Sequence, residues 1–162
     1  MGKNDIELRK ADTIFGELDR LHRTISQRAY ELFKNQSAGW GTALNDWLNA
    51  ERELVWKPAI ELRQKDNQFE VLAATAGVDP KDLDIQVTPD ALLIKAKIDH
   101  EHTSNKGTVH VCEFSSGSLF RSVHFPEKID PGSVKTEYKN GMLRLTAAIA
   151  KTRPTKVEIK AA

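Results

Sequence analysis

The sequence predicts a mainly β protein: an antiparallel β-sandwich with a helical arm before it and an extended tail after it. After Pro58 the spacing of apolar residues changes from the three- and four-residue step of helices to the two-residue step of strands. Turn-forming pairs such as Pro89-Asp90 and Asn140-Gly141 separate the alternating runs. The runs leave no room for crossover helices, which argues against a parallel sheet. We therefore expect an arm at 1–55, a sandwich at 56–150 and a tail at 151–162.

The N-terminal arm is expected to be helical from about Asn4 to Asn35. Its apolar residues recur every three or four positions and therefore share one helix face; they include Ile14, Leu18, Leu21, Ile25, Ala29 and Leu32. Two glycines around Trp40 interrupt the pattern, because glycine favours turn conformations. A second short helix is expected to begin near Thr42 and to end before Pro58.

The sandwich strands are predicted from apolar residues at alternate positions. These are Ile60 and Leu62, Phe69 to Ala73, Leu83 to Val87, Leu92 to Ala96, Val109 and Val111, Leu119 to Phe125, and Leu143 and Leu145. A polar excursion at 99–117 contains one of these runs, the expected strand Thr108–Phe114. An excursion of this length is usually functional or disordered. Asn140-Gly141 is interpreted as a two-residue hairpin turn, since both residues tolerate positive φ.

Charge and composition argue against several classes of partner. The 162-residue chain is 40% hydrophobic and 29% charged, which is a globular balance. Its formal net charge of +1 does not favour nucleic-acid binding. No apolar stretch approaches the roughly 20 residues of a membrane span, and the charged N-terminus lacks a signal core. With Cys112 as the single cysteine, no intramolecular disulfide can form, so we expect a cytoplasmic protein without membrane association.

Neither an enzyme nor a cofactor is expected. The sequence has no G-x-S-x-G elbow, no Gly-rich phosphate loop and no H-E-x-x-H motif. His100, His102 and His110 are close in sequence, but no further carboxylate or cysteine pattern completes a recognisable zinc motif. We therefore expect no metal site, and we interpret Cys112 as a small packing residue.

Three segments of the expected sandwich resemble the α-crystallin domain of small heat-shock proteins. Phe69–Val87 is similar to the start of that domain, with Ala76 where the family usually has proline or leucine. Glu113–Pro126 matches the family pattern E-R-x-x-G-x-F-x-R-x-x-x-L-P, and Val134–Leu145 matches A-x-x-x-N-G-V-L with two substitutions. In the tail, V-E-I at 157–159 resembles the family's I/V-x-I/V element. The length of the 99–117 excursion and the strand expected within it resemble the bacterial and plant members, so a bacterial-type protein is expected.

The resemblance implies an immunoglobulin-like sandwich and an ATP-independent holdase chaperone, which binds partly unfolded proteins under stress and suppresses their aggregation. The missing phosphate loop favours holding over ATP-driven refolding. The alternative is an adaptor similar to the CS-domain co-chaperones, which share the sandwich and bind other chaperones. That alternative predicts a monomer, whereas the holdase predicts a large homo-oligomer.

The resemblance also implies a strand-exchanged dimer, in which the strand within 99–117 pairs with the partner's sandwich. The expected interface residues are Val109, Val111, Glu113 and Arg121. Arg121 lies on an otherwise apolar strand face, so its permanent charge needs an anion or water. Glu113 is the expected partner. The alternatives are an intrachain hairpin arm and an arginine exposed at a sheet edge.

Higher assembly is expected to use the tail. By resemblance, Val157 and Ile159 fill a groove on another subunit. Its expected lining is Leu83, Ile85, Val87, Val134 and Thr136. The alternative is a frayed tail.

Clients are expected to bind apolar residues of the N-terminal arm, because unfolding proteins expose apolar segments. The nominated residues are Phe15, Leu18, Phe33, Trp40 and Trp47. The same face could instead pack on the sandwich or on a neighbouring subunit, and the two uses are compatible.

Overall fold

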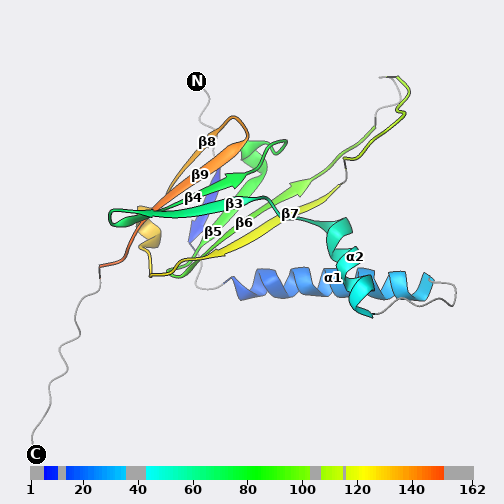
Figure 1. Ribbon diagram of the computed structural model, residues 1–162, viewed down its shortest axis with the longest axis horizontal. Helices are drawn as coiled ribbons and strands as arrows, with labels where there is room; N and C mark the ends of the chain where they lie inside the picture. The colour runs from blue at the N-terminus through cyan, green and yellow to red at the C-terminus, as the bar shows by residue number, and fades with distance from the viewer. Residues whose placement is uncertain (1–5, 11–13, 36–42, 103–106, 115, 152–162) are drawn as a thin grey trace, which may run out of the picture.

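Two sheets packed face to face form the body of the computed structural model (Figure 1). The structure describes residues 6–10, 14–35, 43–102, 107–114 and 116–151. One sheet has the order β1 (Glu7–Lys10), β5 (Leu83–Val87), β6 (Ala91–Ile98), β7 (Gly117–His124) and β2 (Val55–Trp56). The other has the order β3 (Ile60–Lys65), β4 (Gln68–Ala74), β9 (Met142–Ala148) and β8 (Lys135–Lys139). The predicted β-sandwich is thereby confirmed.

The core lies between the sheets and follows the two-residue period of the strands. On β4, Phe69, Val71 and Ala73 are each at most 1% exposed, while the residues between them are half-buried. On β9, Leu143 and Leu145 are buried in the same way. Complete burial of such a side chain contributes roughly 1.5–3 kcal/mol, so this alternation holds the sheets together.

Antiparallel hairpins connect most neighbouring strands, as predicted. The turn between β8 and β9 has φ of 53° at Asn140 and 77° at Gly141, and Lys139 pairs with Met142 across it. These angles are those of the two-residue hairpin that the Asn-Gly pair predicts. Only β1 with β5 and β2 with β7 pair in parallel among the described strands.

Two helices, α1 (Phe15–Asn35) and α2 (Ala43–Leu54), carry a second apolar cluster on the outer face of the β5-β6-β7 sheet. Ile25 of α1 and Ala50 of α2 belong to this cluster together with Leu93 of β6 and Phe120 of β7. Consecutive residues of β6 are therefore buried, because its two faces meet different cores. Neither helix has the length and the apolar composition that crossing a bilayer requires.

The N-terminal helix is shorter than the sequence predicts. Glu7–Lys10 forms strand β1 instead of the first helical turns, and α1 begins at Phe15. The segment pairs with the free edge of β5, and Ile6 packs against the main core. Tertiary pairing thus overrides a weak local helical preference, because an open sheet edge offers unpaired backbone groups.

The expected strand at 108–114 has no strand partner within the described chain. Val109, Val111 and Phe114 are exposed by 51%, 81% and 78%. The excursion that carries them extends away from the sandwich beyond β6 and β7 (Figure 1). The described residues 108–114 thus form no strand within the single chain, and their predicted pairing with a partner chain stays a prediction.

Candidate functional site

The outer edge of β5 is the first candidate surface, because the expected tail-binding groove includes this strand. Leu83, Ile85 and Val87 are at most 1% exposed and belong to the core. The other two expected lining residues, Val134 and Thr136, are half-buried. Sequence reasoning did not anticipate that the β5 edge is already paired, in the register Glu7 to Asp84 and Leu8 to Ile85.

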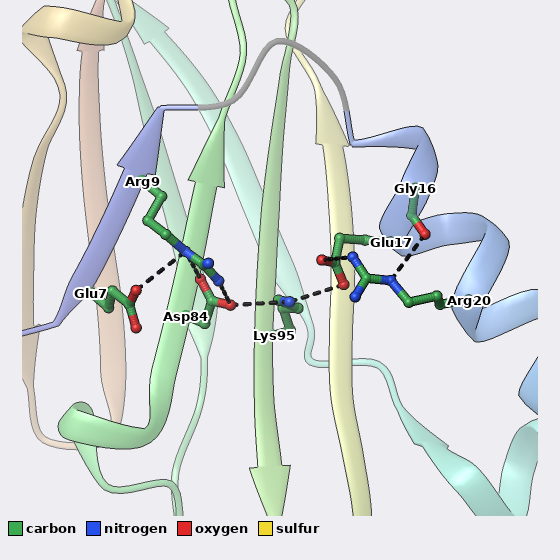
Figure 2. Close-up of polar contacts among 7 residues, drawn as sticks. All are labelled: Glu7, Arg9, Gly16, Glu17, Arg20, Asp84 and Lys95. Atoms are coloured by element: carbon green, nitrogen blue, oxygen red, sulfur yellow. Dashed lines mark hydrogen bonds and ion pairs between the residues drawn. The ribbon is translucent and has the colours of Figure 1, made fainter.

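A chain of charged side chains ties the N-terminal residues to this sheet (Figure 2). Asp84 of β5 contacts Arg9 of β1 and lies 3.0 Å from the Nζ atom of Lys95 on β6. The Lys95 ammonium also lies 2.9 Å from a carboxylate oxygen of Glu17 on α1, and Arg20 donates to the other oxygen at 2.6 Å. The alternating charges therefore connect β1, two sheet strands and α1 in one row.

Partial burial strengthens the middle of this row. The side chains of Glu17, Asp84 and Lys95 are exposed by only 19%, 20% and 24%. The hydrogen bond from Lys95 lowers the pKa of the Glu17 carboxyl below its ordinary value, although desolvation opposes that shift. On β1, the hydrogen bond to Asp84 raises the pKa of the Arg9 guanidinium.

Arg121 is half-buried on β7, between the core residues Leu119 and Val123. Its Nε atom is buried and has no hydrogen-bond partner within the described residues. Glu113 is exposed, and no ion pair joins it to Arg121 in the described part of the chain. The structure therefore leaves a buried guanidinium donor open, at the residue that the resemblance assigns to the dimer interface.

The nominated client-binding residues separate into two groups. Phe15 and Phe33 are 76% and 58% exposed on α1, whereas Leu18 and Trp47 pack against the second apolar cluster. Trp40 lies outside the described residues. The structure adds further exposed apolar side chains, which are Tyr30, Leu44 and Leu48. Sequence reasoning missed them because the face that a helix leaves open depends on how it docks.

A cluster of metal-binding residue types lies within the excursion at 99–117. The donor atoms of His100, His102 and Cys112 all lie within 4.8 Å of one another. The Sγ atom of Cys112 is 3.4 Å from Nε2 of His100, and the two histidine rings meet edge to face at 4.9 Å. Cys112 is exposed in the single chain, so its packing against a partner chain stays a prediction. Sequence reasoning did not anticipate that these three side chains meet, and the expectation of no metal site stays a prediction.

Residues 61–160 match the model of the Hsp20/alpha crystallin family, which covers the sandwich and continues into the tail. Residues 20–55, which include most of α1 and all of α2, match a second model described only as a protein of unknown function (DUF2934). The helical arm is therefore recognisable as a sequence unit, although that match assigns no activity.

Related sequences agree with the first match. An alpha-crystallin of Mycobacterium tuberculosis is 36% identical over 102 residues, which cover 62% of this chain and 68% of that protein. A probable 15 kDa heat shock protein of Leptospira interrogans is 30% identical over 113 residues, which cover 68% of this chain and 83% of that protein.

Solved structures show the same fold. A small heat-shock protein from Xylella fastidiosa has a TM-score of 0.52 and 25% identity, covering 65% of this chain and 98% of that one. Heat shock protein 16.0 from Schizosaccharomyces pombe has a TM-score of 0.54 and 24% identity, covering 66% and 99%. The matched sandwich, its turn motifs and these relatives together show that the chain belongs to the Hsp20/alpha crystallin family of small heat-shock proteins.

Proposed function

We propose that this protein is an ATP-independent, non-enzymatic holdase of the cytoplasm, which binds partly unfolded proteins and keeps them from aggregating. The observation that carries the proposal is the set of apolar side chains that the helical arm leaves exposed. Phe15 and Phe33 on α1 are mostly exposed and are not members of the second apolar cluster, and Leu44 on α2 is 65% exposed. Such side chains can bury apolar segments of unfolding clients without reading their sequence.

Self-assembly is the second part of the proposal. Strand exchange through 99–117 supplies an edge partner for residues 108–114, which have none within the described chain. The partner chain also supplies an anion for the open Nε donor of Arg121. Dimers then associate through the tail triplet at 157–159. Clients and other copies of this chain are therefore the partners that we propose.

The experiment is light scattering from a heat-labile client protein, with and without this chain and without ATP. We expect the wild type to suppress scattering at an equimolar ratio. A Phe15→Ser and Phe33→Ser double variant is expected to suppress it several-fold less. The matched control is Thr24→Ser and Gln27→Ser, which changes exposed polar residues of the same helix.

The holdase proposal is contradicted if the client aggregates to the same extent with and without the wild-type chain. Native mass tests the adaptor alternative independently, because an adaptor is expected to remain a monomer. A monomer that leaves client aggregation unchanged would favour the adaptor.

A further inference from the structure

We infer that His100, His102 and Cys112 form a binding site for a thiophilic divalent cation, Zn²⁺ being the best match. Tetrahedral zinc has Zn–S and Zn–N bonds of about 2.3 Å and about 2.0–2.1 Å, which place adjacent S and N ligands about 3.5 Å apart. The Sγ–Nε2 distance between Cys112 and His100 is 3.4 Å, which is close to that spacing. The third donor atom lies within 4.8 Å, so a small side-chain rotation completes three ligands.

The surroundings of the cluster support a structured site. The backbone N–H of His100 donates to Ser116 Oγ at 2.9 Å, and that hydroxyl donates back to the carbonyl of His100 at 3.3 Å. The ring of Phe114 lies 5.0 Å from the His100 ring. These contacts join the start of the 99–117 excursion, at His100, to its end, at Phe114 and Ser116, close to the proposed ligands.

Donor chemistry favours a borderline-soft cation over calcium or magnesium. Two nitrogens and one sulfur suit zinc, whereas hard cations require oxygen ligands. The pocket beside His100 is lined by the carboxylates of Asp99 and Glu113 and by the cation of Arg52, so its charges are mixed and the choice of cation rests on the donor atoms. A bound cation would join residue 100 to residue 112 across the excursion, and so fix the base from which the exchange strand extends.

The first experiment titrates the full chain with Zn²⁺ against a chromophoric chelator, and then with Co²⁺ as a spectroscopic probe. We expect one ion per chain and a thiolate-to-cobalt charge-transfer band. Cys112→Ser should abolish the band, and His102→Ala should weaken zinc binding by more than about tenfold, since even outer-shell changes cost 10–100-fold. His110→Ala, on the same excursion, and His124→Ala, on β7, are the matched controls.

Hydrogen exchange provides a readout of the clamp itself. Zinc should slow amide exchange in residues 99–102 and 111–114 of the wild type but not of Cys112→Ser. The inference is overturned if the chain does not bind zinc at micromolar concentrations. Equal affinity in the wild type and Cys112→Ser, or equal losses in the His102 and His110 variants, would overturn it too.

A second inference concerns the β5 edge and rests on the tail binding proposed above. We infer that β1 and the tail compete for this edge. The residues at 6–9, I-E-L-R, and those at 157–160, V-E-I-K, share the pattern apolar, glutamate, apolar, basic. The inner edge of β5 pairs with β6, so one outer edge remains for both segments.

The contacts of β1 show how one segment would replace the other. Ile6 packs against the core, and Arg9 binds Asp84. In the tail, Val157 and Lys160 hold the corresponding places of the pattern, so they would take over these two contacts. Leu8 is 37% exposed and Glu7 is exposed, so β1 is held largely by one apolar and one ionic contact beside its backbone pairing.

The experiment uses full-length chain carrying Val157→Ala and Ile159→Ala, to which a fluorescent peptide of residues 153–162 is added. Adding Arg9→Ala should tighten peptide binding about threefold to fivefold, because removing a surface ion pair of up to about 1 kcal/mol makes the edge more available. Arg63→Ala, which removes an exposed ion pair with Glu61 on β3, is the control.

Two outcomes separate this inference from the proposed function. If the peptide binds equally well with and without Arg9→Ala, tail binding stands and competition with β1 is overturned. If the peptide does not bind to any variant, the tail-binding proposal fails as well. Client aggregation is measured separately and depends on neither result.

Discussion

At the residue scale, Gly141 shows how one position combines two constraints. Its φ of 77° lies in the left-handed region, and a Cβ atom there would be 2.9 Å from the Cβ of Ala76. The carbonyl of Gly141 also accepts a hydrogen bond from the Thr75 amide at 2.8 Å. The family signature N-G is therefore explained here by the turn and by close packing.

Gly141→Ala is expected to lower the free energy of unfolding by about 1–3 kcal/mol, since the left-handed conformation and the contact both oppose a side chain. Urea denaturation at fixed protein concentration measures the change. Gly16→Ala is the control, because its added Cβ meets nothing within 4 Å. Equal stability of Gly141→Ala and wild type would contradict this account.

Arg121 is the second informative residue, because its buried Nε lacks a partner within the described chain. Arg121→Gly is expected to change oligomer size and lower the melting temperature, since a partner chain's anion would then lose its cation. Native mass and thermal melting test this. Arg144→Gly, at an exposed position on β9, serves as the control. Unchanged size and melting temperature in Arg121→Gly would count against an interface role.

At the element scale, the charged row couples the N-terminal arm to the sheet. The arm is not attached by apolar packing alone, because Glu17 of α1 and Arg9 of β1 both reach the pair formed by Asp84 and Lys95 (Figure 2). Protonation of the Glu17 carboxylate removes its ion pair with Lys95, which is the link between the sheet and α1. The docking of α1 should therefore weaken in acid.

Glu17→Gln is expected to lower the free energy of unfolding at pH 7 by about 1 kcal/mol. The pKa of Glu17 is lower in the folded chain than its unfolded value of about 4.3. Its stabilisation is therefore complete above about pH 4.3 and is lost as pH falls through the folded pKa. Wild type and variant should converge in stability over that acid range.

Denaturation curves at several pH values test the convergence. Asp19→Asn is the matched control, since its pair with Arg23 is exposed on the same helix. A constant difference between wild type and Glu17→Gln down to pH 3 would show that the charge of Glu17 does not stabilise the docked arm.

At the scale of the whole molecule, two described parts of the chain are not covered by the rest of it. The segment 108–114 of the excursion has no strand partner within the described residues, and α1 and α2 have apolar side chains exposed to solvent. Both features are accounted for if other copies of the chain cover them in a resting assembly. Heating that separates the copies would then expose client-binding surface.

Val157→Ala with Ile159→Ala is expected to reduce the oligomer to dimers, because burial of each side chain contributes at most roughly 1.5–3 kcal/mol and many weak links act together. Deleting residues 101–114 should remove the dimer itself. Native mass spectrometry measures both, with Glu158→Ala as the control for the tail. An intact large oligomer in the tail variant, or an intact dimer after the deletion, would refute the corresponding contact.

Most strands from β3 to β9 could be predicted from sequence because their apolar residues alternate and their turns carry Asn, Gly, Pro or Asp. The exception is β8, whose run K-T-E-Y-K is mainly polar. β1 could not, since a four-residue run such as E-L-R-K is compatible with helix and strand alike. Which state it adopts depends on the free edge of β5, about 75 residues away in sequence. The exposed side of α1 likewise depends on docking.

The sequence by itself therefore determined the fold class, most of the sandwich strands and the family, because these depend on local periodicity and on motifs read along the chain. Only the tertiary structure decided that β1 covers the β5 edge and that Cys112 meets His100 and His102. The physical reason is that edge pairing and donor clusters join residues distant in sequence, and short segments without strong local preference take the conformation that such contacts stabilise.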